Sequence, residues 1–427
     1  MLQISYLRES KAAALTGLAK RNFPDAEQTI DRAIRLDDRR RALQTELDGL
    51  RAERKRLSDE IGGLFKSGKR EEASAKKAQV TGMKDQIAAL ETEQQTNRQE
   101  LTDALLSIPN VPNPLVPAGS SEEDNEIYRP YTGELPTPDV AAQPHWELAE
   151  TYGIFDLELG VKTTGSGFPV FTGQGARLQR ALVNYFLDRN TAAGYREYAP
   201  PHLVNEDTAR ATGQLPDKEG QMYHVTEDDL YLIPTAEVPL TNLYRDVILD
   251  PEELPVKLTG YTPCFRRQAG SYGAHVRGLN RVHQFDKVEI VQLALPEKSY
   301  AALEDMVEHV AGLLDELDLP YRILRLCGGD LGFTSALTYD FEVWSAAQER
   351  WLEVSSVSNF ETYQSNRLKL RYREEKGNEL AHTLNGSALA LPRIIAALLE
   401  NNQTADGILL PEVLHAYVGK ERLTAER

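Results

Sequence analysis

Residues 257–293 read KLTGYTPCFRRQAGSYGAHVRGLNRVHQFDKVEIVQL, two strand-like runs joined by a glycine-rich segment. The runs at residues 257–266 and 282–293 are neighbours in the chain, and the turn residues between them suit a hairpin. Adjacent pairs of this kind favour an antiparallel sheet in an α+β domain over a doubly wound parallel sheet. Helix-like segments accompany the strands in this part of the chain, for example at residues 176–189, 299–317 and 392–401.

The second run has two distinct faces, because side chains alternate along a strand. One face carries Phe285, Lys287, Glu289 and Val291. The opposite face carries Asp286, Val288 and Ile290. An aromatic ring and a carboxylate on one face can line a pocket, although a solvated face is the commoner outcome for such a strand.

The glycine-rich segment contains two arginines, Arg266 and Arg267, at its start. A guanidinium group holds phosphate or carboxylate oxygens through paired hydrogen bonds. The segment therefore suits an anionic ligand.

The charge of the chain is unevenly distributed. Its 427 residues include 48 basic and 65 acidic side chains, a net charge of −17. As an average, this charge argues against a nucleic-acid partner. Residues 1–106, however, hold 20 basic and 18 acidic side chains, whereas the remaining residues hold 28 and 47. The chain is therefore electrostatically two parts, and the average charge does not exclude a polyanionic partner for residues 1–106.

Two heptad seams predict long helices at residues 34–64 and 80–104, with Gln94 and Asn97 as polar interruptions in the second. The segment between them, residues 62–70, contains three glycines that suit a helix end and a reversal. We expect an antiparallel helical hairpin, a coiled-coil arm of about 45 Å that projects from the body. A helical pair packed flat on the rest of the protein is the alternative.

Basic side chains crowd the outer faces and the tip of this expected hairpin: Arg51, Arg54, Lys55, Arg56, Lys66, Lys69, Arg70, Lys76 and Lys77. Acidic side chains are interleaved with them. The pattern alone leaves nucleic-acid binding and an ordinary solvated face about equally open.

Residues 107–139 contain seven prolines, so they cannot continue the second helix. We find no apolar run of 18 or more residues, and the N-terminus lacks the apolar block of a signal peptide. We therefore expect a cytoplasmic protein without membrane association. The two cysteines, Cys264 and Cys327, are too few for a disulfide framework or a cysteine-rich zinc site.

Several motifs occur together in a fixed order: LIPTAEVPLTN (232–242), FRRQAGSYG (265–273), RGLNRVHQFDKVE (277–289), EVSS (353–356) and HTLNGS (382–387), followed by Arg393. With the N-terminal hairpin, they make the chain resemble a bacterial-type seryl-tRNA synthetase, a class II aminoacyl-tRNA synthetase, over essentially its whole length. The resemblance implies that L-serine and ATP form seryl-adenylate. It also implies transfer of the seryl group to the 3′ end of serine tRNA, and to selenocysteine tRNA where that tRNA exists.

The resemblance also implies the organisation of the molecule. It predicts a class II antiparallel β-sheet catalytic domain flanked by helices, and a homodimer whose interface includes residues 176–189. The helical arm would grip the serine tRNA. We expect a tRNA-binding domain at residues 1–110, a proline-rich linker at 111–135 and the catalytic domain at 136–427.

ATP binding would involve three of the motifs. Arg266 matches the arginine that contacts both the α-phosphate and the serine carboxylate, and Arg393 matches the one that holds the γ-phosphate; these are the expected catalytic residues. Phe285 matches the ring on which adenine stacks. Glu353 and Ser356 match Mg²⁺ contacts, and because residues three apart cannot share a face of a regular strand, we expect a bulge or a strand end there. The implied ATP contacts are Arg266, Arg267, Gln268, Val282, His283, Gln284, Phe285, Glu353, Val354, Ser355, Ser356 and Arg393.

The implied serine pocket comprises Thr235, Ala236, Glu237, Arg266, Glu289, Asn385 and Ser387. Glu289 and Ser387 are expected to contact the hydroxyl end of serine. Buried groups aimed at that hydroxyl reject alanine, which would leave them unpaired, whereas threonine must be excluded by a tight pocket.

The sequence departs from the family pattern at Gln268, where a glutamate is usual. A carboxamide oxygen still accepts a hydrogen bond from the adenine amino group, but it lacks the charge. Two other interpretations stay open: a synthetase paralogue that charges a carrier other than tRNA, and a coiled-coil adaptor with a degenerate nucleotide-binding body.

Overall fold

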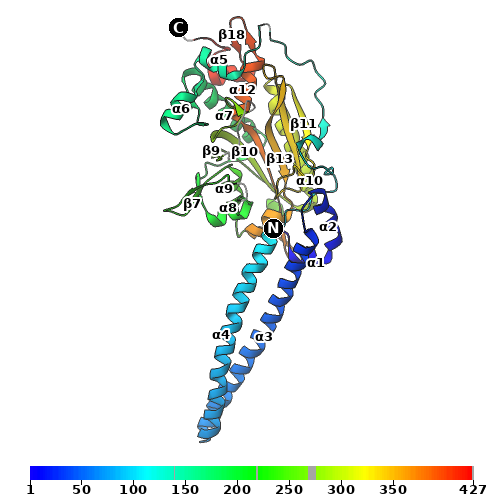
Figure 1. The fold of residues 1–427 in the computed structure, drawn as a ribbon, viewed down its shortest axis with the longest axis vertical. Helices are drawn as coiled ribbons and strands as arrows, with labels where there is room; N and C mark the ends of the chain where they lie inside the picture. Colours follow the sequence, from blue (N-terminus) through cyan, green and yellow to red (C-terminus); the bar gives the residue numbers. More distant parts are fainter. Residues whose placement is uncertain (139, 218–219, 268–275, 426–427) are drawn as a thin grey trace. The chain divides into compact units, whose positions relative to one another are not determined.

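The computed structural model describes residues 1–138, 140–217, 220–267 and 276–425. It divides into two compact units, which are described separately (Figure 1). Unit 1 comprises Met1–Ala19 and Phe23–Pro109, and unit 2 comprises Lys20–Asn22 and Asn110–Arg427.

Unit 1 is helical. Its short helices are α1 (Ile4–Glu9) and α2 (Lys11–Lys20), and its long helices are α3 (Ala26–Lys66) and α4 (Arg70–Ser107). Figure 1 shows α3 and α4 as an antiparallel pair. The prediction of a helical hairpin is confirmed, and both helices extend beyond the seams from which they were predicted. Among the described helices of both units, none is long and apolar enough to cross a membrane.

The two heptad seams face each other in the hairpin. The seam residues Leu43, Leu47 and Leu57 of α3 are buried, as are Ile87 and Leu101 of α4. The polar interruptions lie in the seam too: Gln94 Nε2 donates to Gln44 Oε1 at 2.9 Å, and Asn97 is buried. The hydrophobic pattern therefore identified the contact surface, including its polar positions.

The reversal between the two helices occupies residues 67–69. Gly68 has a φ of +78°, a left-handed conformation that glycine adopts without steric cost. The expectation that Gly62 and Gly63 mark the helix end is wrong, because both lie inside α3. Each glycine costs a helix about 1 kcal/mol relative to alanine, which the helix tolerates here, and the flanking seam residues Ile61 and Leu64 are half-buried.

Unit 2 is built on one eight-stranded sheet. Its order is β1-β11-β12-β13-β16-β10-β9-β4, and its pairs are antiparallel except for β4 and β9. The strands are β1 (Glu126–Arg129), β4 (Arg196–Glu197), β9 (Val256–Phe265), β10 (Gln284–Ala294), β11 (Tyr321–Arg325), β12 (Leu337–Ser345), β13 (Arg350–Asn359) and β16 (His382–Ala390). The predicted hairpin is the pair β9 and β10, and the predicted α+β class is confirmed.

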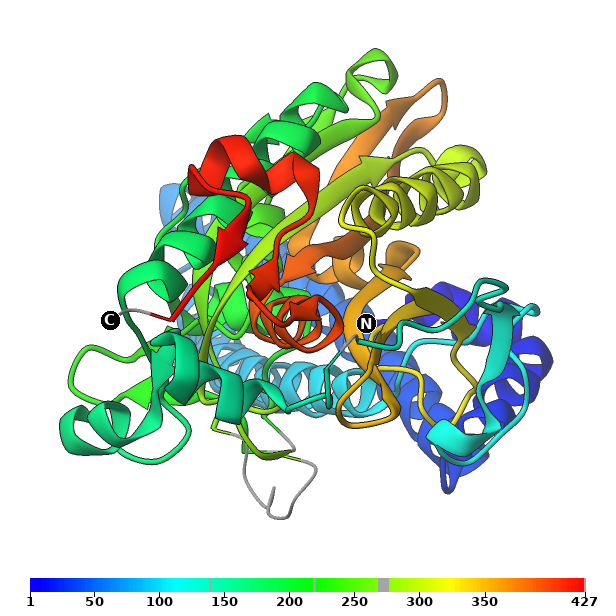
Figure 2. The same ribbon diagram turned by 90° about the horizontal axis from the view of Figure 1, so that it is seen from above.

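One face of the sheet packs against three helices, α7 (Gly173–Ala192), α10 (Ser299–Glu316) and α12 (Leu391–Asn401). Figure 2 shows α12, in orange-red, lying against the strands. Val288 and Ile290 of β10 belong to the hydrophobic core on this side, as their predicted face requires. The other face of β10 carries Lys287 and Glu289. The strand therefore has the hydrophobic core on one side and the predicted serine residues on the other.

Shorter elements border the sheet. The helices are α5 (His145–Tyr152), α6 (Leu157–Thr163), α8 (Glu206–Thr212), α9 (Glu237–Asn242), α11 (Thr362–Leu368) and α13 (Glu412–Val418). The remaining strands form small sheets: β2 (Phe155–Asp156) with β3 (Val170–Phe171); β5 (Leu203–Asn205), β7 (Leu230–Leu232) and β6 (Tyr223–Val225); β8 (Ile248–Leu249), β14 (Arg371–Glu374) and β15 (Gly377–Leu380); β17 (Gln403–Thr404), β18 (Gly407–Leu409) and β19 (Arg422–Leu423).

Strand β13 contains the bulge expected between Glu353 and Ser356. Opposite β12, Ser355 pairs with Phe341 and Glu353 pairs with Glu342, so Val354 has no partner in the register. The extra residue changes the face on which the following side chains lie. The prediction of a bulge is confirmed.

Candidate active site

The predicted serine residues meet around Glu289 on β10. Glu289 Oε2 lies 2.6 Å from Lys287 Nζ and accepts a hydrogen bond from Thr235 Oγ1 at 3.2 Å. Ser387 of β16 is the cross-strand partner of Glu289. Glu289 Oε1 is buried and has no hydrogen-bond partner among the described residues. An unpaired buried oxygen is costly unless a ligand supplies the donor.

Glu237, at the start of α9, is a second buried carboxylate in this group. Its Oε1 accepts a hydrogen bond from Gln364 Nε2 at 2.7 Å, and Gln364 Oε1 in turn accepts from Thr383 Oγ1 at 2.7 Å. Burial, followed by the charge of Glu289, raises the pKa of Glu237 to about 7. Burial also raises the pKa of Glu289, and the nearby Lys287 partly offsets this rise.

Arg266 follows the last residue of β9. Its backbone N–H donates to His283 O at 2.8 Å, and its Nε lies 3.4 Å from Pro234 O, next to the serine residues. The guanidinium carbon is 5.3 Å from the ring centroid of Phe285, which is half-buried. Arg266 and Phe285 therefore lie together at one end of the β9–β10 hairpin, as predicted, and Phe285 is not part of the hydrophobic core.

Arg393, in the first turn of α12, is oriented by two backbone carbonyls. Its Nε donates to Asn280 O at 2.9 Å and its NH1 donates to Glu353 O at 2.6 Å. The same NH1 lies 3.6 Å from the exposed carboxylate of Glu353. The two predicted ATP motifs, EVSS and the start of α12, are thus in direct contact.

The side-chain oxygens of Glu353 and Ser356 determine whether this part of the site could hold Mg²⁺. No group of three or more His, Cys, Asp or Glu side chains able to hold a metal occurs in the described ranges. The exposed Glu353 carboxylate and the half-buried Ser356 supply hard oxygen donors, and Mg²⁺ commonly takes one or two protein ligands together with phosphates and water. Beside Ser356, burial and the charge of Glu353 raise the pKa of Asp340. These residues fit a magnesium ion that arrives with a nucleotide.

The other predicted site residues have varied positions. Ala236 and Val282 are buried, Gln284 is exposed at the start of β10, and Arg267 is exposed with its guanidinium carbon 5.9 Å from the ring of Tyr223. Val354 packs in the hydrophobic core, and the Oγ of Ser355 donates to Ser387 O at 2.6 Å. Asn385 hydrogen-bonds Glu237, and the ring of His283 stacks on Phe168. Gln268 lies outside the described residues.

Two members of the pocket received no role from the sequence. Lys287 was assigned to the face of Glu289 by the alternation along the strand, but a lysine there could equally have pointed into solvent. Gln364 comes from α11, more than a hundred residues after Glu237, and a lone buried glutamine leaves no sequence pattern. Only the folded chain brings these partners together.

Three comparisons bear on the identity of this arrangement. Residues 222–402 match the family model of the tRNA synthetase class II core domain (G, H, P, S and T), and residues 1–112 match that of the seryl-tRNA synthetase N-terminal domain. The fold is therefore that of a class II aminoacyl-tRNA synthetase.

Individual relatives specify the family further. The chain is 53% identical over 400 residues to the serine–tRNA ligase of Salinibacter ruber, covering 93% of each chain. It is 45% identical over 428 residues to the enzyme of the same name from Chlorobium phaeovibrioides, covering 99% of each. A crystal structure of seryl-tRNA synthetase from Pyrococcus horikoshii complexed with ATP superimposes with a TM-score of 0.91 at 33% identity, covering all of both chains. The chain belongs to the seryl-tRNA synthetase family, and the predicted serine–tRNA ligase activity is confirmed.

Proposed function

We propose that the residues of the site divide the ligase reaction as follows. In the first step an oxygen of the serine carboxylate attacks the α-phosphorus of ATP, and pyrophosphate leaves with the electron pair of the broken P–O bond. In the second step a terminal ribose hydroxyl of tRNA attacks the carbonyl carbon of the adenylate, the bond from that carbon to the phosphate oxygen breaks, AMP leaves with its electron pair, and the hydroxyl proton is released to water. The first step needs no general base, because the attacking carboxylate is already ionised near neutral pH.

Arg266 would hold both anions of the first step. A carboxylate and an α-phosphate repel each other, and a planar cation with several donors can bind both and stabilise the charge that develops at phosphorus. The position of Arg266 between Pro234, beside the serine residues, and Phe285 supports this role. Phe285 would stack on adenine, and Gln268 would accept from its amino group.

The serine pocket is the observation that carries the proposal. Glu237 and Glu289 are two buried carboxylates. Lys287 pairs with Glu289, and Arg266, whose charge also acts on Glu289, would be occupied by the serine carboxylate and the phosphate, so the pocket would keep one excess negative charge. A substrate ammonium group would neutralise this charge. Glu289 Oε1, which lacks a described partner, and Ser387 would bind the serine hydroxyl. Alanine would leave the carboxylate oxygen unpaired, which costs about 1–3 kcal/mol in a buried site.

Arg393 would hold the γ-phosphate of ATP, and Glu353 with Ser356 would hold a magnesium ion bound to the phosphates. Mg²⁺ supplies positive charge that neutralises the leaving pyrophosphate. The protein's own contribution is orientation: the Arg393 guanidinium donates to the carbonyls of Asn280 and Glu353, which fix its direction.

The α3–α4 hairpin would bind serine tRNA through its backbone and shape. Several of its basic side chains are engaged with acids, for example Arg51 with Glu91. Others make no ion pair with a described residue: Arg54, Lys55, Lys66, Arg70 and Lys77. These cations are available to phosphates, which position a nucleic acid without reading its sequence. The match of residues 1–112 to a synthetase N-terminal domain argues against a paralogue with a different carrier.

We further infer a homodimer that uses α7, a cytoplasmic location, and selenocysteine tRNA as a second substrate where it exists. These three inferences rest on the family resemblance.

The serine pocket is tested most simply by Glu289→Ala. We expect serine-dependent ATP–pyrophosphate exchange to fall by about a hundredfold or more, because one change removes the proposed acceptor of the hydroxyl and the partner of Lys287. Glu374→Ala, at an exposed position on β14, is the matched control and should leave exchange unchanged. Exchange retained by Glu289→Ala would show that serine binds elsewhere.

A further inference from the structure

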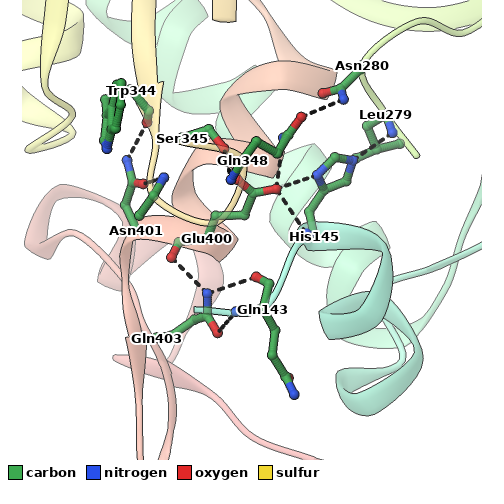
Figure 3. Close-up of polar contacts among 11 residues, drawn as sticks. Gln143, His145, Leu279, Asn280, Trp344, Ser345, Gln348, Glu400, Asn401 and Gln403 are labelled. Carbon is green, nitrogen blue, oxygen red and sulfur yellow. Dashed lines mark hydrogen bonds and ion pairs between the residues drawn. The ribbon is translucent and has the colours of Figure 1, made fainter. Parts of the chain in front are cut away.

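A buried polar network lies at the far end of α12 from Arg393, and of its members only Asn280 has a role in the reaction described above (Figure 3). Its centre is the carboxylate of Glu400, whose side chain is fully buried. Four groups donate to it: the backbone N–H of His145 at 3.0 Å, His145 Nδ1 at 2.7 Å, Gln348 Nε2 at 3.0 Å and the hydroxyl of Ser345. Burial raises the pKa of Glu400, and the hydrogen bonds, led by the one from His145 Nδ1, lower it.

The imidazole of His145 connects Glu400 to the segment that returns to β10. His145 Nε2 accepts a hydrogen bond from the backbone N–H of Leu279 at 2.8 Å. A backbone N–H can only donate, so Nε2 carries no proton and the ring proton must reside on Nδ1, facing Glu400. The carboxylate thereby selects one tautomer of the ring, and that tautomer holds Leu279.

A second connection reaches the next residue of the same segment. Gln348 donates to Glu400 through Nε2 and accepts from Asn280 Nδ2 through Oε1 at 2.8 Å. The carbonyl of Asn280 is the acceptor of Arg393 Nε. Arg393 and Glu400 both belong to α12. The chain of hydrogen bonds through Gln348 and Asn280 therefore connects one end of this helix to the other.

The segment also lies tightly against α5. A Cβ on Gly278 would be 2.2 Å from His145 Nε2, and Gly278 has a φ of +69°, so any other residue there would displace the ring. The guanidinium carbon of Arg277 is 4.9 Å from the ring centroid of Trp146. These contacts hold residues 277–280 against α5.

We propose that His145 and Glu400 are positioning residues for Arg393, acting through Leu279 and Asn280. The proposal rests on the proposed contact of Arg393 with the γ-phosphate of ATP. A guanidinium group must present its donors at a fixed angle to bind phosphate oxygens, and an error of about 1 Å in such a contact can cost about a hundredfold in rate. The network restricts the movement of the Asn280 carbonyl, which is the acceptor that orients Arg393.

Two substitutions of one residue separate positioning from simple core stability. The terminal atoms of asparagine reach the place of the imidazole Nδ1, and those of glutamine reach the place of Nε2. His145→Asn therefore keeps a donor to Glu400 and loses the acceptor for Leu279, whereas His145→Gln keeps that acceptor and loses the donor. Steady-state pyrophosphate exchange gives KM values for ATP and for serine separately.

We expect His145→Asn to raise KM for ATP about tenfold and His145→Gln to raise it no more than about threefold, with KM for serine within twofold of wild type in both. Denaturation midpoints of the variants verify that both fold. Equal KM values for ATP in the two variants, or a parallel rise of both KM values, would overturn the proposal. If His145→Asn does not fold, Gln348→Ala at a half-buried position should raise KM for ATP alone, and no change there would also overturn it.

Arg393→Ala distinguishes failure of this inference from failure of the proposed ATP contact. An unchanged KM for ATP in Arg393→Ala would reject the contact itself. When Arg393→Ala raises KM for ATP, the double variant with His145→Asn should raise it no further, because a positioning residue acts only through the group that it positions. Additive effects of the two changes would mean that His145 acts on ATP binding by a route other than Arg393.

Discussion

At the scale of single residues, the pocket around Glu289 combines groups that are costly to bury. Lys287 is 5% exposed and Glu289 is not exposed at all. One oxygen of Glu289 has two partners and the other has none among the described residues. A core selected for stability alone would avoid such an arrangement. The cost is understandable if the substrate supplies the missing donor.

The pKa of Glu237 predicts how serine binding depends on pH. Burial and the neighbouring Glu289 raise this pKa to about 7. As pH falls through 7, the carboxyl takes up a proton and its attraction for the substrate ammonium is lost. We expect kcat/KM for serine in pyrophosphate exchange to decline about tenfold per pH unit once the pH is well below 7.

Glu237→Gln is the control for this assignment, because the amide keeps the shape and cannot titrate. The variant should have a lower kcat/KM for serine that no longer changes between about pH 6 and 8. A decline near pH 7 that persists in the variant would assign the titration to another group.

At the scale of elements, the periodic patterns of the sequence predicted the features that depend on neighbouring residues, namely the buried faces of helices and strands. The heptad seams gave the contact surface of α3 and α4, and the alternation of β10 separated Val288 in the core from Glu289 in the site. The three-residue spacing of Glu353 and Ser356 predicted the bulge in β13. The prediction of a helix end at Gly62 and Gly63 was wrong, because glycine only weakens a helix and packing along the seam overrides that preference.

Contacts between elements distant in the chain left no such pattern. Gln364 on α11 supports Glu237, and Glu400 at the end of α12 meets His145 at the start of α5. Each is a single polar residue in an otherwise unremarkable segment, and its partner is determined by the sheet topology. The residues proposed to bind ligands carry motifs in the sequence, whereas the residues that contact and orient them became visible only in the fold.

Shortening the hairpin tests its role as a separate element. We propose replacing residues 51–86 with a short glycine-serine turn, which removes the outer part of α3 and α4 and keeps the buried Leu43, Leu47 and Leu101. Serine-dependent pyrophosphate exchange should be retained within about twofold, because no proposed site residue is removed. Aminoacylation of tRNA should fall by at least about a hundredfold with loss of the phosphate contacts.

The two assays together decide the outcome of the truncation. Loss of exchange as well as aminoacylation would make the outer hairpin a structural support of unit 2. Full aminoacylation by the shortened chain would place the tRNA contacts elsewhere.

At the scale of the whole molecule, the net charge of −17 combines two parts with different roles. The acidic excess follows residue 106, in the part of the chain that would bind ATP through a few oriented arginines such as Arg266 and Arg393. The near-neutral first 106 residues include the hairpin with its available basic side chains. The average charge therefore gives no guide to the partner, whereas the charge of each part does.

The central claim is that one chain both selects serine and transfers it to tRNA. The most direct measurement is ATP–pyrophosphate exchange with each of the 20 amino acids, followed by charging of total tRNA with the amino acid that supports exchange. We predict exchange with serine, at least about a hundredfold weaker exchange with alanine and threonine, and seryl groups on serine tRNA. Exchange that prefers another amino acid, or serine activation without charged tRNA, would contradict the account.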